Sequence, residues 1–313
     1  MRLLIGIALI AFILSLVIGM TALSAKDEPK GTIAISGAWA IYPTAVAWAE
    51  NFQKRHPQAK IDVSAGGAGK GAAEAISGLV DIGMVSREPD KTEIEKGIMP
   101  IYMLHDAVFP VASANNPALD DLLKKGVDKN TWTGIYIKGS ITSWDDVVGK
   151  ELSKNIHVYT RSDACGAAAS WAGYMGKKQE DLKGVGIYGD PGLLDAATKD
   201  PLGIGFSNFS YVFTSQGSVV KGAILVPIDS NANGIADPDE VYNDRASAID
   251  AIRKGAYPAT RKNYFFVKGK PRGLVKEFIE FALSEEGTKI VDETGASLSL
   301  DKAQRAEVLE SIK

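Results

Sequence analysis

Cysteine and histidine are scarce in this chain. Its 313 residues include one cysteine, Cys165, and three histidines, His56, His105 and His157. A single cysteine excludes an intrachain disulfide and a zinc site of the Cys-x-x-Cys type, and the scattered histidines match no metal motif. An excess of one charge is also missing, because 35 Lys and Arg stand against 38 Asp and Glu, for a net charge of −3. This balance argues against a general nucleic-acid binder, which carries a basic excess.

Long uncharged apolar runs are also rare, and the one that occurs lies at the N-terminus. Residues 3–23 carry no charge, follow Arg2 and precede the small residues Ser24 and Ala25. This order is typical of a secretory signal, and about 20 apolar residues also suffice to span a bilayer uncleaved. Residues 1–25 are therefore predicted to be a signal peptide or an uncleaved membrane anchor, which puts the chain from Lys26 onward outside the cytoplasm.

The next part of the sequence alternates short apolar runs with helical patterns. Residues 32–36, 61–64 and 81–85 predict three strands, and apolar residues at helical spacing predict helices between them. Strand–helix–strand order with short connections predicts parallel strands and right-handed crossovers. The loops after these strands then share the edge of the sheet at which open α/β sheets bind ligands.

The same alternation restarts further along the chain. Strands are predicted at 135–137, 157–160, 185–188 and 203–206, with helices at 143–148, 164–174 and 193–198. Extended segments at 105–112 and 264–267 are predicted to cross between the two halves. The sequence therefore predicts an α/β protein of two lobes, one formed by 31–110 with 265–313 and the other by 111–264. Clefts at such junctions are favoured ligand sites.

The turn after the strand at 157–160 is the most informative segment. Arg161 ends the strand, and Cys165 and Gly166 lead into a helix of small residues. The free N–H groups and the dipole of a helix N-terminus favour an anion at the place that the guanidinium also reaches. The segment predicts an anion receptor. The alternative is an ordinary strand-to-helix turn with a solvated arginine.

The order of these segments resembles the substrate-binding proteins of phosphate ABC transporters, which have the two-lobed type II periplasmic-binding-protein fold. The resemblance is carried by residues 43–56, 66–69, 80–83, 161–167 and 202–206. It implies a mainly parallel sheet flanked by helices in each lobe. It also implies an extracytoplasmic protein that binds phosphate or a related oxyanion in the cleft and delivers it to a membrane permease. An extracytoplasmic sensor or adhesion protein that reuses the fold is the alternative.

The resemblance also implies the ligand-binding residues, but most of the family's hydroxyl donors are replaced. Arg161 and Gly166 match the family pattern, and Asp163 stands where an acidic residue orients the arginine. Alanine, cysteine or tryptophan stands at four positions where the family has serine or threonine. Ser86 and Arg87 follow the strand after which some members carry an aspartate. The implied ligand-binding set is Ala38, Trp39, Ala40, Ala68, Gly69, Ser86, Arg87, Arg161, Cys165, Gly166 and Ala167.

A second polar segment, residues 229–240, fits a calcium loop. Oxygen-bearing side chains occupy loop positions 1, 3, 5, 9 and 12, and glycine occupies position 6. The expected ligands are Asp229, Asn231, Asn233, the carbonyl of Ile235, Asp237 and Glu240. A structural Ca²⁺ is the one cofactor that we expect. A polar hairpin loop is the alternative, because the residues before Asp229 predict a strand and not an amphipathic helix.

An enzyme is not expected. A helix N-terminus lowers the pKa of a thiol, so Cys165 is the one candidate nucleophile. A cysteine nucleophile needs a nearby base, and nothing in the sequence places His157 beside it. Residues 66–71 contain Lys70 but lack the P-loop pattern, which argues against nucleotide binding.

Overall fold

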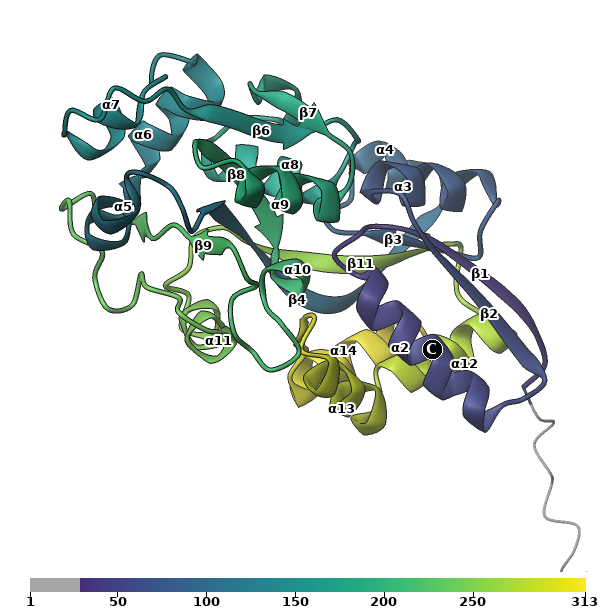
Figure 1. Ribbon diagram of the computed structural model, residues 1–313. Helices are drawn as coiled ribbons and strands as arrows, with labels where there is room; N and C mark the ends of the chain where they lie inside the picture. Colours follow the sequence, from purple (N-terminus) through teal and green to yellow (C-terminus); the bar gives the residue numbers. More distant parts are fainter. Residues whose placement is uncertain (1–28) are drawn as a thin grey trace, which may run out of the picture.

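The computed structural model describes residues 29–313, and its first part follows the predicted alternation (Figure 1). The predicted signal or anchor at residues 1–25 lies outside the described residues. The elements are β1 (Gly31–Gly37), α2 (Tyr42–Arg55), β2 (Ala59–Ala65), α3 (Ala68–Ser77), β3 (Ile82–Val85), α4 (Lys91–Glu95) and β4 (Ile98–Ser113). Pro43 lies in the first turn of α2, which its fixed φ suits. The helix buries Ala45, Trp48 and Phe52 on one face.

The middle of the chain builds the second half of the molecule. Its helices are α5 (Leu119–Lys125), α6 (Lys129–Thr133), α7 (Trp144–Val148), α8 (Gly166–Tyr174), α9 (Asp190–Lys199), α10 (Phe209–Val212) and α11 (Arg245–Arg253). Its strands are β5 (Val127–Asp128), β6 (His157–Arg161), β7 (Val185–Ile187), β8 (Gly203–Asn208), β9 (Ala223–Leu225) and β10 (Ile228–Asp229). Two short helices, η1 (Gly134–Lys138) and η2 (Gln179–Asp181), complete this part.

The C-terminal part returns to the first half. It contains β11 (Thr260–Lys268), α12 (Gly273–Ala282), α13 (Glu285–Thr294), β12 (Leu298–Ser299) and α14 (Lys302–Ser311). Trp48 of α2 donates an indole hydrogen bond to the carbonyl of Gly287 in α13 at 2.9 Å, which ties this return to the N-terminal helix. No helix within residues 29–313 is long and apolar enough to cross a membrane.

One sheet runs through both halves in the order β2-β1-β3-β11-β4-β8-β6-β7, with β9 and β12 also paired to β4. Strands β1, β2 and β3 are parallel, as are β6, β7 and β8. The 16-residue strand β4 and its antiparallel partner β11 form the middle of the sheet (Figure 1). The predicted crossing at 105–112 is part of β4, and the one at 264–267 is part of β11.

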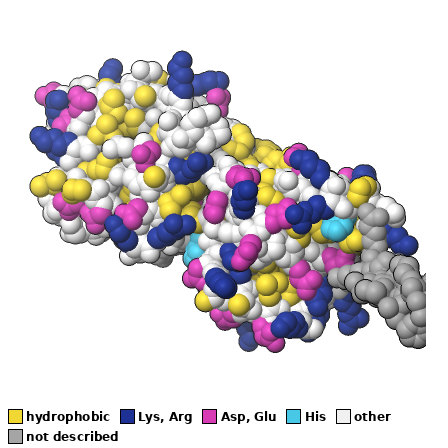
Figure 2. All heavy atoms as spheres, turned by 90° about the horizontal axis from the view of Figure 1, so that it is seen from below, with side chains coloured by type: hydrophobic (Ala, Val, Ile, Leu, Met, Phe, Trp, Pro, Cys, Tyr) yellow, Lys and Arg dark blue, Asp and Glu magenta, His cyan; other side chains and the backbone are white. Residues whose placement is uncertain are grey.

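Two separate hydrophobic cores define two lobes. The first core gathers Ile33, Trp48, Phe265 and Phe278, and the second gathers residues such as Phe109, Trp171 and Phe206. Strand β4 contributes to both, because Leu104 lies in the first core and Phe109 in the second. Figure 2 shows the two lobes from below, with positive and negative side chains interspersed over the visible face. The predicted two-lobed fold class is confirmed, whereas the exact lobe boundaries stay a prediction.

The strand predicted at 135–137 is wrong. These residues belong to the π-helical turn η1, which continues α6. Tyr136 is fully buried there, with its ring centroid 5.8 Å from that of Trp171. A short apolar run is compatible with a buried strand or a buried helical turn, and periodicity alone does not separate the two.

Candidate anion-binding site

The predicted anion-binding loops meet at the junction of the lobes. The N–H of Gly69 in the first lobe donates to the carbonyl of Ala164 in the second, at 3.0 Å. A Cβ atom at Gly67 would lie 2.8 Å from Oδ2 of Asp163, and one at Gly166 would lie 2.0 Å from the carbonyl of Ser86. Real Cβ atoms do not approach so closely, so these glycines allow the two lobes to touch at the start of α8.

Most of the predicted ligand-binding residues are buried in this contact. The buried members are Ala38, Ala40, Ala68, Ser86, Arg161, Cys165, Gly166 and Ala167. Trp39, Gly69 and Arg87 are partly buried. The N–H groups of Gly166 and Ala167 open α8 and therefore have no carbonyl partner within the helix. The arrangement can present backbone donors to an anion between the lobes.

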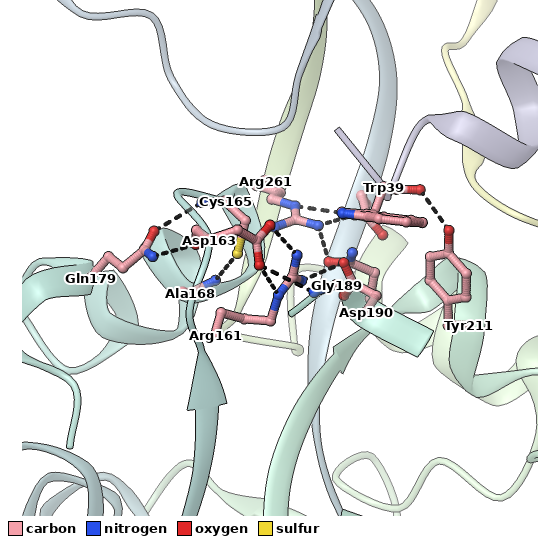
Figure 3. Close-up of polar contacts among 12 residues, drawn as sticks. Trp39, Arg161, Asp163, Cys165, Ala168, Gln179, Gly189, Asp190, Tyr211 and Arg261 are labelled. Carbon is pink, nitrogen blue, oxygen red and sulfur yellow. Dashed lines mark hydrogen bonds and ion pairs between the residues drawn. The ribbon is translucent and has the colours of Figure 1, made fainter. Parts of the chain in front are cut away.

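Arg161 is held between two carboxylates (Figure 3). Its Nε lies 2.8 Å from Oδ1 of Asp163 and its Nη2 lies 2.6 Å from Oδ2 of the same residue. Its Nη1 lies 2.5 Å from Oδ2 of Asp190. The alternative of a solvated arginine is wrong, because the side chain is 0% exposed. The bidentate contact with Asp163 fixes the direction of the guanidinium, as the resemblance implies.

A second buried arginine, Arg261 on β11, was missed by sequence reasoning. Its Nε lies 3.1 Å from Oδ2 of Asp106 on β4, and its Nη2 also bonds Asn208 at the end of β8. Figure 3 shows Arg261 close to Arg161 and Asp190. The sequence offers no local signal for this group, because Arg261 and Asp106 lie 155 positions apart.

Asp190, the first residue of α9, is the other functional candidate that sequence reasoning missed. The side chain is buried, which raises its carboxyl pKa, although Arg161 and Arg261 act in the opposite direction. It follows a strand predicted at 185–188, so the rule that selected the other loops could have selected this one too.

Four polar atoms of this cluster are buried without a hydrogen-bond partner among the described residues. They are Nε1 of Trp39, Nη1 of Arg261, Oδ1 of Asp106 and Oδ1 of Asp190. Buried polar groups are rarely left unpaired. Figure 3 shows the indole nitrogen of Trp39 pointing toward Asp190 and Arg261. The cluster therefore offers both donors and acceptors to a ligand.

Aromatic side chains close one end of the contact. The ring of Trp39 stands edge-on to Tyr188 of the second lobe, with centroids 6.1 Å apart. The hydroxyl of Tyr211 donates to the carbonyl of Trp39 at 3.1 Å (Figure 3). Trp39 therefore occupies the junction itself.

An open cleft of about 560 Å³ is lined by residues of both lobes, including Gly69, Arg87, Cys165, Lys177 and Gln179. The predicted ligand residue Arg87 contributes to this cleft, but its guanidinium binds both oxygens of Glu93, at 3.0 and 2.7 Å. Its charge is thus largely neutralised within the first lobe.

Cys165 lacks the surroundings of a nucleophile. Burial raises the pKa of its thiol to about 12, and Sγ accepts a hydrogen bond from the N–H of Ala168 at 3.4 Å. The candidate base His157 instead lies with Nδ1 2.6 Å from Oδ2 of Asp200. The neutral, buried thiol of Cys165 acts as a cap of α8.

The predicted calcium ligands share one loop between β10 and α11. The Asp229 carboxylate accepts hydrogen bonds from the N–H groups of Asn233 and Gly234, at 3.1 and 2.8 Å. The side-chain amides of Asn231 and Asn233 donate to Asp237, at 2.8 and 3.0 Å. Glu240 returns to the start of the loop, where Oε1 accepts from the N–H of Ser230 at 2.6 Å.

Acidic side chains alone do not mark this loop as a metal site. No group of three or more His, Cys, Asp or Glu side chains in the described part of the chain is placed to hold a metal ion. Calcium at Asp229, Asn231, Asn233, Ile235, Asp237 and Glu240 therefore stays a prediction.

Comparison with known proteins identifies the family. A profile described as a PBP superfamily domain matches residues 23–286. The chain belongs to the PBP superfamily. One curated relative is the phosphate-binding protein PstS of Bacillus subtilis. It is 29% identical to this chain over 273 residues, and the match covers 86% of this chain and 81% of the relative. PstS of Methanocaldococcus jannaschii is 24% identical and covers 91% of this chain and 88% of the relative.

Solved structures agree with the two-lobed fold. A Clostridium perfringens protein described as a phosphate ABC transporter substrate-binding protein, solved with bound phosphate, superposes with a TM-score of 0.71 at 24% identity. The superposition covers 87% of this chain and 100% of the Clostridium perfringens chain. A phosphate transport receptor from Vibrio cholerae gives a TM-score of 0.64 at 22% identity, with coverage of 86% and 100%. The predicted resemblance to this group of binding proteins is confirmed.

Proposed function

We propose that this protein is the extracytoplasmic substrate-binding protein of an ABC transporter and captures phosphate or a related oxyanion between its lobes. Relatives named phosphate-binding protein match most of its length, at 29% and 24% identity. The transporter's permease is the proposed partner. Residues 1–25 are the proposed secretion signal or membrane anchor. Binding, not catalysis, is the proposed role, since the one cysteine is buried and the candidate base His157 pairs with Asp200 instead.

The convergence of Arg161 with the N-terminus of α8 at the lobe junction carries this proposal. A guanidinium and a set of free backbone N–H groups together form an anion receptor. The glycine-rich loop before α3 approaches the same point, where Gly69 bonds Ala164. Closing the lobes would bring donors from both sides onto one ligand.

The missing hydroxyl groups set the expected strength and selectivity. A hydrogen bond to a charged group contributes about 1.5–3 kcal/mol, so four lost donors would weaken binding by several orders of magnitude without replacement. The indole N–H of Trp39 and the free N–H of Arg261 are the replacements that we propose. The ligand is then a small oxyanion, with phosphate as the first candidate.

Isothermal titration of the purified protein with phosphate, sulfate, tungstate and methylphosphonate tests the proposal. We expect saturable binding of one anion per chain, with phosphate among the ligands. Arg161→Gln should abolish it, whereas Arg55→Gln, a change at an exposed arginine of α2, should not. Absence of binding to every anion at millimolar concentration would contradict the proposal.

The sensor or adhesion alternative predicts the same ligand but no transporter. Uptake of labelled phosphate by cells that express the protein with its neighbouring permease distinguishes the two. Transport that requires the protein supports the proposed role, and unchanged uptake in its absence supports the alternative.

A further inference from the structure

We propose that Asp190 takes up a proton when the anion binds, so that capture of phosphate by this protein is coupled to proton uptake. This inference rests on the proposed function and deepens it. It follows from the charges that the protein itself buries at the lobe junction.

The buried cluster contains more negative than positive charge. Its cations are Arg161 and Arg261, with 0% and 5% of the side chain exposed. Its anions are Asp163, Asp190 and Asp106, with 9%, 2% and 0% exposed. With Asp190 ionised, three carboxylates and two guanidinium groups leave one excess negative charge before any ligand enters. An arriving phosphate dianion adds two more, and uncompensated charge away from water is strongly unfavourable.

Asp190 has the oxygen that is best placed to take the compensating proton. Both oxygens of Asp163 accept hydrogen bonds from Arg161, and Oδ1 also accepts from the N–H of Gly189. Asp106 also has an unpartnered Oδ1 within residues 29–313, but its Oδ2 accepts two N–H groups of Arg261, which stabilise the ionised form of this carboxylate. Asp190 accepts a single bond, from Arg161, and its Oδ1 has no partner within residues 29–313. A proton on this oxygen can be shared with an oxygen of the ligand.

The other groups that face Asp190 do not compete for the proton. Arg161 comes from β6, Asp163 and Cys165 from the turn before α8, Arg261 from β11, Asp106 from β4 and Tyr211 from α10. Burial raises the pKa values of the Cys165 thiol and the Tyr211 hydroxyl, so both stay protonated near neutral pH. The guanidinium groups keep their charge throughout.

Opposing effects act on the pKa of the Asp190 carboxyl. Burial raises its pKa, whereas Arg161, Arg261 and the N-terminus of α9 favour the ionised form. Opening of the lobes admits water and favours the ionised form further. Closure around an anion excludes water and adds negative charge, and both changes raise the pKa.

The proton balance depends on the form of the free ligand. Above the second ionisation of phosphate the ligand arrives as HPO₄²⁻, and the additional proton comes from the solvent. Below it the ligand arrives as H₂PO₄⁻ and brings the proton itself. The bound complex holds the same number of protons in both cases, with one shared between Asp190 Oδ1 and a ligand oxygen.

Calorimetry at pH 8 and above measures this proton directly. Phosphate is titrated into the protein in Tris and in HEPES, and the observed enthalpy is compared with the ionisation enthalpy of each buffer. We expect the wild type to take up about one proton per phosphate. Its Kd should rise about tenfold per pH unit once the pH exceeds both the second pKa of phosphate and the pKa of Asp190 in the unliganded protein. Asp190→Asn should lose the uptake and keep its Kd nearly constant. The matched control Asp195→Asn, at an exposed position of the same helix, should behave as the wild type.

Tight phosphate binding without proton uptake in the wild type would overturn this inference and leave the proposed function intact. The same holds if Asp190→Asn folds, binds phosphate and takes up the proton as the wild type does. If the wild type does not bind phosphate at all, both this inference and the proposed function of capturing phosphate are overturned. Because the wild-type measurement needs no mutation, a misfolded Asp190→Asn protein does not prevent the test.

Discussion

Replacing Gly166 by alanine should weaken anion binding by preventing the two lobes from closing. The added Cβ would lie 2.0 Å from the carbonyl oxygen and 2.2 Å from Oγ of Ser86, so the β3 loop or the start of α8 must move. Overpacking of this kind costs about 1–3 kcal/mol. Since about 1.4 kcal/mol corresponds to tenfold in affinity, the Kd for phosphate should rise roughly 5- to 150-fold.

Calorimetry and thermal unfolding together check this prediction. Ser86 and Gly166 belong to different lobes, so the clash exists in the closed state and the unliganded, open protein should melt near the wild-type temperature. Gly173→Ala is the matched control, because it lies on the same helix and a Cβ there meets nothing within 4 Å. A Gly166→Ala protein that binds phosphate as tightly as the wild type would refute the reasoning. So would a loss of affinity of equal size in Gly173→Ala.

Four further predictions follow from the same contacts. Arg161→Gln leaves Asp163 and Asp190 buried without their partner, and breaking such a pair costs about 3–5 kcal/mol. Urea denaturation should therefore show a decrease of that size in the free energy of unfolding. An unchanged midpoint would contradict the buried pairing. Trp39→Phe keeps an aromatic ring beside Tyr188 but removes the free N–H, so the affinity for phosphate should fall about 10- to 150-fold. A variant that binds phosphate as tightly as the wild type would exclude the indole as a donor. Because the pKa of Cys165 is raised to about 12, the thiol should stay protonated and react with a disulfide reagent at pH 8 only after unfolding; rapid reaction of the folded protein would be inconsistent with this burial. Calcium should raise the melting temperature of the wild type and not of Asp229→Ala, and if EGTA and calcium leave the wild type unchanged, the loop at 229–240 is a polar loop only.

The sequence predicted which loops meet at the lobe junction, because the positions of these loops follow from strand order. Periodicity and small residues placed Trp39, Gly69, Ser86 and Cys165 at the carboxyl ends of strands, and the structure brings these loops together at the lobe junction. Parallel strands joined by short crossovers leave little freedom in where such loops lie. The resemblance also implied that Asp163 orients Arg161, and the structure shows this contact.

The sequence could not predict the charges that surround Arg161. Arg261 and Asp106 meet through the antiparallel pairing of β11 and β4, which join distant parts of the chain. The register between these strands shifts at Asn263 and Tyr264, and no local pattern fixes it. The helical turn at 134–138 was missed for a different reason, since tertiary packing of Tyr136 against Trp171 decides its form.

A crystal structure of the protein grown with phosphate tests the central claim most directly. We expect one phosphate between the lobes, with its oxygens within hydrogen-bond distance of the N–H groups that open α8 and of the polar atoms of Trp39, Arg261 and Asp190. A structure with closed lobes and no phosphate at this junction, or with phosphate bound elsewhere, would contradict the account.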